Sequence, residues 1–314
     1  MTRNTANEND QDASQRDSPS DAASRPTEKG LLVGLDGSAG SRHALHWAVG
    51  RTAEFGLIQP LITWQYPWWA YTGPVPLAEN EFEQQATREV KAVLAQITRD
   101  RYLPPIVCRG RPGQTLVETG ADHALTVVGT RGRSGVEDAL LGSVSSYVVA
   151  HAKAPVAVIP PTAPAEGPQD RLVVGIDGSA NSVSALEWAL THASPQATIE
   201  AVHSWVYPAS AMPDLAVMSY DDYEIAAKRV LDETVAAAVE AVKATGRTQP
   251  RAEVVKRLEY GDPRTVLHEC ESDCDLLILG RRGRGGLAHL LLGSVTTALV
   301  HQPATAVVVV PAAG

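Results

Sequence analysis

The chain has 314 residues, enough for two domains of ordinary size, and 44% of them are hydrophobic, so each domain can bury a core. The net charge of −9 argues against a surface for nucleic acids or anionic membranes, because either would need a basic face. No apolar run approaches the ~20 residues that cross a bilayer. Residues 1–29 are polar and lack the apolar core of a secretory signal, so we expect a disordered leader on a cytoplasmic protein.

Residues 30–160 form the first expected domain, in which short apolar runs alternate with helical patterns. Val90, Val93, Leu94 and Ile97 have the i, i+3, i+4, i+7 spacing of one helix face. The other helices are expected after Ser41, at 115–121 and at 143–150, and the strands at 31–35, 61–64, 106–108, 125–128 and 156–159.

Residues 171–312 form the second expected domain and follow the same order. Their longest helix has a stripe of small and branched apolar residues at helical spacing. A proline-rich linker, residues 161–170, joins the two domains. Alternating strands and helices predict an open, mostly parallel sheet with helices on both faces, once in each domain. The stripe consists of Leu231, Val235, Ala238, Val239 and Val242.

A glycine motif occurs twice, at corresponding places in the two domains. Both copies read Gly-x2-Gly-x9-Gly-Ser, and each directly follows an apolar run. Asp-Gly-Ser after the first strand is duplicated as well, at Asp36 and Asp177. Glycines let a backbone approach an anion closely, and N–H groups at the start of a helix point toward it. The motif glycines are Gly129, Gly132 and Gly142 in the first copy and Gly280, Gly283 and Gly293 in the second.

These motifs together resemble the universal stress protein family, most closely its ATP-binding branch in tandem, two-domain form. The resemblance covers roughly residues 30–160 and 171–312, and the Trp-Ala helices and polar leader look like actinobacterial members. It implies two tandem five-stranded sheets of order 3-2-1-4-5, the Rossmann-like fold of the adenine nucleotide alpha hydrolases. In that order the first and fourth strands flank the point where the strand order reverses, which is where such sheets bind ligands.

The resemblance also implies roles for individual residues, with one ATP bound in each domain, together with Mg2+. Asp36 and Asp177 match the aspartate at the adenine and ribose end, and the glycine loops match the triphosphate loop. Arginines add positive charge there, including Arg131, Arg281 and Arg282. The hydroxyls of Ser145 and Thr296 are expected to donate to a phosphate oxygen. The remaining expected ligands are Arg133, Ser143 and Val144 in the first domain and Arg284, Ser294 and Val295 in the second.

Three functions are weighed against these residues. The favoured one is a nucleotide-dependent regulator of stress response or dormancy, acting through a change of conformation or assembly. A slow ATPase or nucleotidyl-transfer enzyme is the alternative, but no Gly-x4-Gly-Lys-Ser/Thr loop is present and no paired general base recurs in both domains, so we predict no catalytic residues. The third is a dimerisation scaffold without ligand, in which Asp-Gly-Ser merely caps a helix and the loop arginines are solvated.

The two domains are expected to differ in nucleotide affinity and to pair with each other. Glu137 and Asp138 fall within the first glycine motif and would repel a triphosphate, so the second domain should bind at least as tightly. The fifth strands, 156–159 and 307–310, are flat and apolar. The family resemblance implies that these two strands pair with each other within the chain. The sequence does not decide whether two chains then form a homodimer.

Two smaller features are interpreted as structural. The segments Trp64–Trp69 and Trp205–Pro208 follow the second strands and could form a flap over the nucleotide, although packing at the core edge is favoured. Cys270 and Cys274 lie four apart on an expected helix near His268, which would allow a metal site. Buried free thiols are the favoured interpretation, and neither a metal nor a disulfide is expected.

Overall fold

The computed structural model describes residues 29–66, 79–132, 141–167, 169–207, 219–246, 252–284 and 290–312. Within these ranges the first half contains five strands in the expected order. They are β1 (Lys29–Leu35), β2 (Ile58–Trp64), β3 (Ile106–Arg109), β4 (His123–Gly129) and β5 (Val156–Ile159). The second half repeats them as β6 (Arg171–Ile176), β7 (Thr198–Trp205), β8 (Glu253–Tyr260), β9 (Leu276–Gly280) and β10 (Ala306–Val310).

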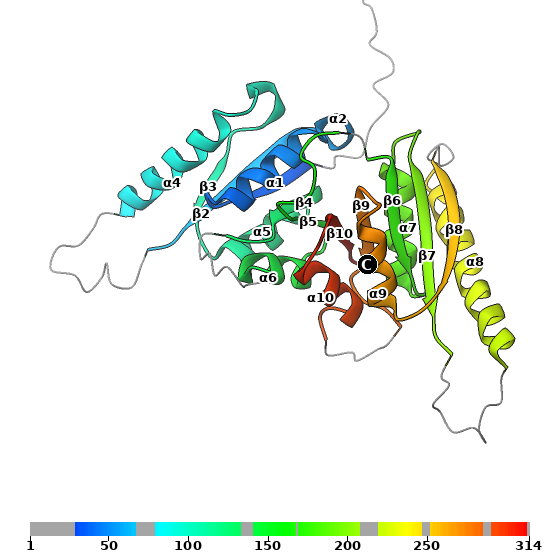
Figure 1. Cartoon of the computed structure of the whole chain (residues 1–314). Coiled ribbons are helices and arrows are strands. Elements are labelled where there is room, and N and C mark those ends of the chain that lie inside the picture. Colours follow the sequence, from blue (N-terminus) through cyan, green and yellow to red (C-terminus); the bar gives the residue numbers. More distant parts are fainter. Residues whose placement is uncertain are drawn as a thin grey trace, which may run out of the picture.

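All ten strands form one continuous sheet, of order β3-β2-β1-β4-β5-β10-β9-β6-β7-β8. Each half therefore has the expected order 3-2-1-4-5, and its strands are parallel. The halves meet where β5 pairs with β10 antiparallel, with Val307 opposite Val158, which confirms the expected pairing of the fifth strands (Figure 1). Every residue of β5 and β10 is buried, so two apolar edges that would invite aggregation cover each other.

Helices cover both faces of this sheet. The side chains of α1 (Ala39–Val49), α4 (Glu79–Leu94), α7 (Ala180–His192) and α8 (Tyr220–Ala244) pack with alternate strand residues in one core, which also includes Phe55 of α2 (Thr52–Phe55). The second core lies on the other face, under α5 (Pro112–Gly120), α6 (Ser143–His151), α9 (Pro263–Glu271) and α10 (Ser294–His301). Both cores run through both halves because the sheet is continuous.

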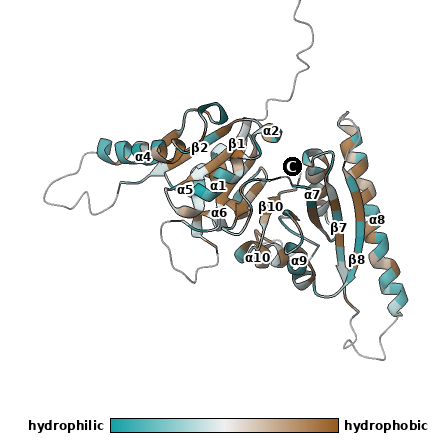
Figure 2. Ribbon diagram, turned by 45° about the horizontal axis from the view of Figure 1, so that its top comes forward, coloured by the Kyte–Doolittle hydropathy of each residue, from teal (hydrophilic) through white to brown (hydrophobic). Residues whose placement is uncertain are grey.

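The outer edge strand β8 is polar, in contrast to the central strands (Figure 2). It carries Lys256 and Arg257, which form ion pairs with Asp232 and with Glu259. Charged side chains on an edge strand oppose pairing with another chain. The outer edge at β8 is therefore protected by charge. The apolar strands β5 and β10 are instead buried at the centre of the sheet.

Three local expectations need correction. The first helix begins at Ala39 rather than after Ser41, because the Ser38 side chain accepts the Ser41 N–H and caps it. Ile97 lies beyond α4, which ends at Leu94, and packs against the core from the following turn. Cys274 lies outside α9, which ends at Glu271, so Cys270 and Cys274 do not share a helix face.

Candidate functional site

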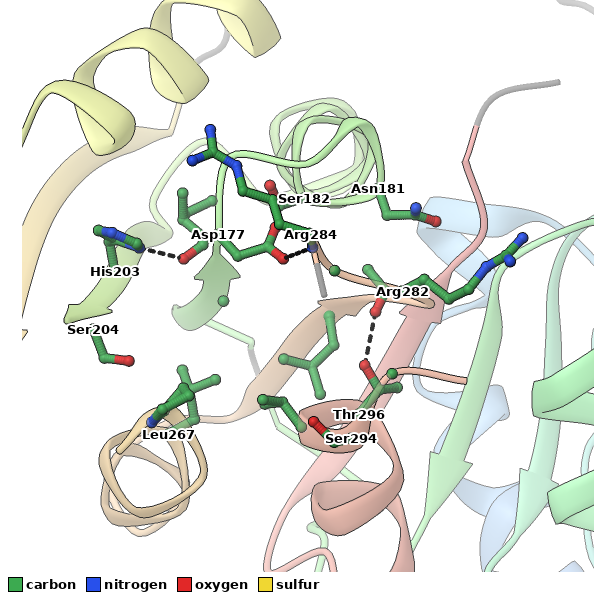
Figure 3. Close-up of a pocket in the computed structure, with 18 of the residues that line it drawn as sticks. Asp177, Asn181, Ser182, His203, Ser204, Leu267, Arg282, Arg284, Ser294 and Thr296 are labelled. Carbon is green, nitrogen blue, oxygen red and sulfur yellow. Dashed lines mark hydrogen bonds between the residues drawn. The ribbon is translucent and has the colours of Figure 1, made fainter. Parts of the chain in front are cut away.

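The second half has a cavity of about 580 Å³ at the carboxyl ends of its central strands (Figure 3). Strands β6 and β9 are neighbours, and they lead into Asp177 and into the glycine loop that begins at Gly280. Residues far apart in sequence therefore meet at the reversal of strand order, as expected. The lining includes Asp177, Asn181, Ser182, His203, Ser204, Leu267, Gly280, Arg282, Gly283, Arg284, Gly293, Ser294, Val295 and Thr296.

Asp177 holds two loops together. Its Oδ1 accepts the N–H of Ser179 at 3.0 Å, and Oδ2 accepts the N–H of Arg284 at 2.9 Å (Figure 3). Asp36 makes the equivalent turn in the first half, where Oδ1 accepts the Ser38 N–H at 2.9 Å. A carboxylate oxygen has two lone pairs, so Asp177 can accept a further hydrogen bond beside these two. The aspartate is thus a clamp on the loop that can still accept a ligand hydroxyl.

The glycines that end β4 and β9 are required by packing against the neighbouring helix. A Cβ at Gly129 would lie 2.7 Å from the Gly40 carbonyl, and one at Gly280 would lie 2.7 Å from Asn181. A Cβ at Gly132 would lie 2.6 Å from Asp36 Oδ2. The glycine motif therefore brings the loop against the first turn of α1 or α7, which in turn shapes the cavity.

One residue in each half connects the loop to the sheet and to the next helix. The N–H of Arg281 donates to the Val310 carbonyl at 2.8 Å, and its own carbonyl accepts the N–H of Gly293 at 3.0 Å. Thr130 makes the same pair of backbone bonds in the first half, to Ile159 and from Gly142. These bonds fix the start of α10 and of α6 next to the glycine loop.

The hydroxyls of Ser145 and Thr296 are buried, and each donates a hydrogen bond to a backbone carbonyl. Ser145 Oγ donates to the Gly129 carbonyl at 2.6 Å, and Thr296 Oγ1 donates to the Gly280 carbonyl at 2.8 Å. Both hydroxyls therefore fasten the helix to the strand end, a role that the sequence interpretation did not include.

The first turns of α6 and α10 lack a side-chain cap, and that of α10 faces the cavity. Both helices begin after a glycine N-cap, Gly142 or Gly293, and no side chain caps them. Serine or aspartate side chains cap α1, α7, α8 and α9, whereas α2 and α5 also begin without a side-chain cap. The first N–H groups of a helix need a partner from outside it, and they attract anions. In α10 these groups belong to Ser294, Val295 and Thr296, all of which line the cavity.

Arg282 and Arg284 supply the positive charge of the cavity. Arg284 also donates through Nη2 to the Gly178 carbonyl at 3.2 Å, which holds its guanidinium over the Asp177 loop. The expectation that Arg281 adds to this charge is wrong, since its Nη1 donates to the Ala152 carbonyl of the first half at 2.8 Å. Burial lowers the pKa of Arg281, and the nearby Arg282 lowers it further. Arg133, Glu137 and Asp138 lie outside the described residues.

His203 and Ser204 line the cavity from the end of β7, and the sequence interpretation missed both. His203 Nδ1 donates to the Ile176 carbonyl at 2.7 Å, so its Nε2 is the acceptor in the neutral ring (Figure 3). No sequence motif marks these two half-buried residues, which follow the buried apolar positions of β7. Only their position at the carboxyl end of a strand beside β6 could have suggested them.

The aromatic segments and cysteines are structural where they are described. Trp205 is 9% exposed and packs on Tyr220 and Tyr260, with ring centroids 4.9 and 5.2 Å apart, which confirms packing at the core edge. Residues 67–69 and 208 lie outside the described residues. Burial raises the pKa of the half-buried Cys274 thiol to about 12, Cys270 is buried, and neither forms a disulfide. No cluster of metal-ligating side chains occurs among the described residues.

The comparisons with known proteins agree with this architecture. The sequence model of the Universal stress protein family matches residues 29–160 and 169–311. Universal stress protein Rv1996 of Mycobacterium tuberculosis is 30% identical over 309 residues, covering 91% of this chain and 96% of its own. Universal stress protein Rv2005c of the same organism is 30% identical over 299 residues, covering 91% and 98%.

A solved structure shares the fold over most of the chain. The universal stress protein from Archaeoglobus fulgidus DSM 4304 has a TM-score of 0.58 at 20% identity, covering 90% of this chain and 96% of its own. In the part of the chain that the structure describes, no helix is long and apolar enough to cross a bilayer. The two matched segments coincide with the two halves of the sheet, and this chain belongs to the universal stress protein family.

Proposed function

We propose that this protein binds ATP, one molecule in each half, and that occupancy regulates its conformation or assembly in a stress response. The observation that carries the proposal is the uncapped first turn of α10, which opens into a cavity beside Arg282 and Arg284. Helix N–H groups and guanidinium groups are the donors that phosphates need. The volume of about 580 Å³ lies within the range of small-molecule sites.

The polar groups of the cavity suggest how a nucleotide would lie. The phosphates would meet the N–H groups of Ser294, Val295 and Thr296, and the ribose hydroxyls would meet Asp177. The base would then face the end of β7, where His203 Nε2 is an acceptor. Mg2+ would bind mainly to the phosphate oxygens and to water, as is usual for this ion, and Asp177 is the only carboxylate in the described lining.

The same hydrogen bonds support a binding role over catalysis. A general base needs a free acceptor aimed at the proton that it removes. Asp177 is held by two backbone N–H groups. His203 Nε2 is an acceptor, but it lies at the end of β7, apart from Ser294 and Thr296 of α10, where the phosphates would lie (Figure 3).

The test is to remove a single N–H donor without disturbing the helix. Proline is tolerated at the first position of a helix, and Gly293 and Gly142 already have the extended backbone that a following proline favours. We expect Ser294→Pro to weaken the second site and Ser143→Pro the first, each by about tenfold, or about 1.4 kcal/mol. Calorimetric titration of ATP with Mg2+ into nucleotide-stripped protein measures both sites.

Alanine variants at the same positions provide the control. Ser294→Ala and Ser143→Ala lose the hydroxyl but keep the N–H, so their affinity should stay close to that of the unchanged protein. Absence of ATP binding by the stripped protein, together with no adenine nucleotide released on purification, would instead favour a ligand-free scaffold. Stoichiometric release of ADP during the titration would favour the slow ATPase.

A further inference from the structure

Glu271 is the last residue of α9, and its carboxyl group is enclosed where α9 meets the segment that leads into β10. The exposed fraction of its side chain is 0%. Its Oε2 accepts the N–H of Ala304 at 3.3 Å and lies 2.8 Å from Nδ1 of His268. Its Oε1 is also buried and has no hydrogen-bond partner among the described residues. The junction therefore contains an ionisable group with one unused oxygen.

The backbone segment that Glu271 holds is also bonded to the connection between the two halves. The carbonyl of Ala304 accepts Oγ1 of Thr162, a residue of the connection, at 2.8 Å. The next residue, Ala163, is buried, and its carbonyl lies 2.7 Å from Nε2 of His43 in α1. The position of Ala304 therefore affects how the connection is held between the second half and α1.

The surroundings of Glu271 do not suit a carboxylate anion. Among the ion pairs of the described residues its one partner is His268, whose side chain is 62% exposed to solvent. From α10, His301 bonds through Nδ1 to a carbonyl of its own helix. A buried carboxylate that lacks donors takes up a proton more readily than one in water. Burial accordingly raises the pKa of Glu271, against the opposing effects of His268 and the Ala304 N–H.

Three other titratable groups face the same junction. They are Cys270 of α9 and, from the turn before β9, Cys274 and Asp275. Burial raises the pKa of both thiols, that of Cys274 to about 12, so both are neutral between pH 5 and 8. Asp275 Oδ2 accepts the N–H groups of Asp170 and Arg171, at the far end of the connection. None of these groups supplies a positive charge to the junction.

The first half has a glycine at the corresponding position. Helices α5 and α9 both have nine residues and begin with proline, and the last residue of α5 is Gly120. A Cβ at Gly120 would collide with Oγ1 of Thr126, a buried residue of β4. The Thr126 N–H donates to the Pro155 carbonyl at 3.0 Å, which joins β4 to the start of β5. The first half therefore provides an internal reference for the same junction without the carboxyl group.

We propose that Glu271 is a proton-sensitive latch, which holds the segment before β10 while it is protonated and releases that segment when it ionises. A neutral carboxyl group fits the enclosed site, whereas an anion leaves Oε1 without a donor and is better solvated outside it. Release frees the Ala304 N–H and loosens the bond from Thr162. The latch is independent of any nucleotide.

The sign of the pH dependence follows from the raised pKa of Glu271 in the folded protein. A glutamate in the unfolded chain has a pKa of about 4.3. The stabilising contribution is therefore complete below a pH of about 4.3 and is lost as the pH rises through the folded pKa.

Hydrogen exchange of the Ala304 N–H in the full chain, corrected for the intrinsic exchange rate at each pH, measures the release. Between pH 5 and 8 we expect its opening constant to rise about tenfold, while that of the Thr126 N–H stays constant. Glu271→Gln keeps the size and an acceptor for Ala304 but cannot ionise, so it should abolish the rise. The matched control is Glu269→Gln, at an exposed position of the same helix, which should respond like the unchanged protein.

His268→Asn separates the carboxyl group from the imidazole. His268 opposes the effect of burial on the pKa of Glu271, so its loss should move the rise to higher pH without removing it. Opening of Ala304 that is independent of pH in the unchanged protein, or an equal rise at Thr126, overturns the proposal, and this comparison needs no variant to fold. A rise that persists in Glu271→Gln also overturns it. A rise that is absent up to pH 9 in His268→Asn does so too, because the imidazole would then be the sensor.

Discussion

The two halves of the chain share their backbone hydrogen bonds and differ in the side chains around them. Thr130 and Arg281 make the same two backbone bonds, and Ser145 and Thr296 close the same contact to a glycine carbonyl. Yet Thr130 is a buried threonine, whereas Arg281 extends to Ala152 in the opposite half. Duplication has therefore kept the framework that positions the glycine loop, while the residues that face the ligand or the partner half have diverged.

The halves also differ at their junction. The first half has α2 between α1 and β2, whereas the described residues 193–197 between α7 and β7 contain no helix. Phe55 of α2 packs on α7, and Arg281 reaches toward the end of α6. Each half thus contributes one contact that the other half lacks, so the interface is asymmetric although the sheet is nearly symmetric.

The largest effect should come from removing the ring that α2 places against α7. Phe55→Ala is expected to lower the free energy of unfolding by about 3 kcal/mol, because it empties a buried aromatic site. Chemical denaturation measures the change. Phe82→Ala is the matched control, since Phe82 is only half-buried and packs on Tyr66. An equal loss in both variants would show that the contact with α7 has no special weight.

A smaller effect, equal in the two halves, should follow loss of the buried hydroxyls. Thr296→Val and Ser145→Ala each remove a donor to a glycine carbonyl, and both are expected to cost about 1–2 kcal/mol. Denaturation of each variant, and of the double variant, tests this. A cost confined to one half would contradict the view that the framework is shared.

The smallest effect should come from making Arg281 resemble its counterpart. Arg281→Thr keeps the backbone bonds but loses the bond to Ala152, and we expect a loss of about 1 kcal/mol. Hydrogen exchange should locate that loss at the carboxyl end of α6. The control is Thr130→Ser, a change at the corresponding position of the first half that retains a hydroxyl. Unchanged exchange at α6 in Arg281→Thr would show that the interdomain bond contributes nothing there.

Much of the fold could be predicted from the sequence because its signals are local and occur twice. Runs such as 156–159 and 125–128 are continuously apolar, which is the pattern of a strand buried on both faces. The paired glycine motifs located the loops after β4 and β9. Errors fell at element ends, as for Ile97 and Cys274, where a helix stops although the apolar spacing continues.

The sequence by itself determined the tandem α/β organisation, the strands, and the segments that contain the glycine loops. Only the tertiary structure decided that Gly280 is packed against Asn181, that Thr296 bonds to a carbonyl, and that Arg281 leaves its own loop for the other half. The physical reason is that periodicity reports which side of an element is buried, whereas a hydrogen-bond partner depends on which distant residue the packing brings within about 3 Å.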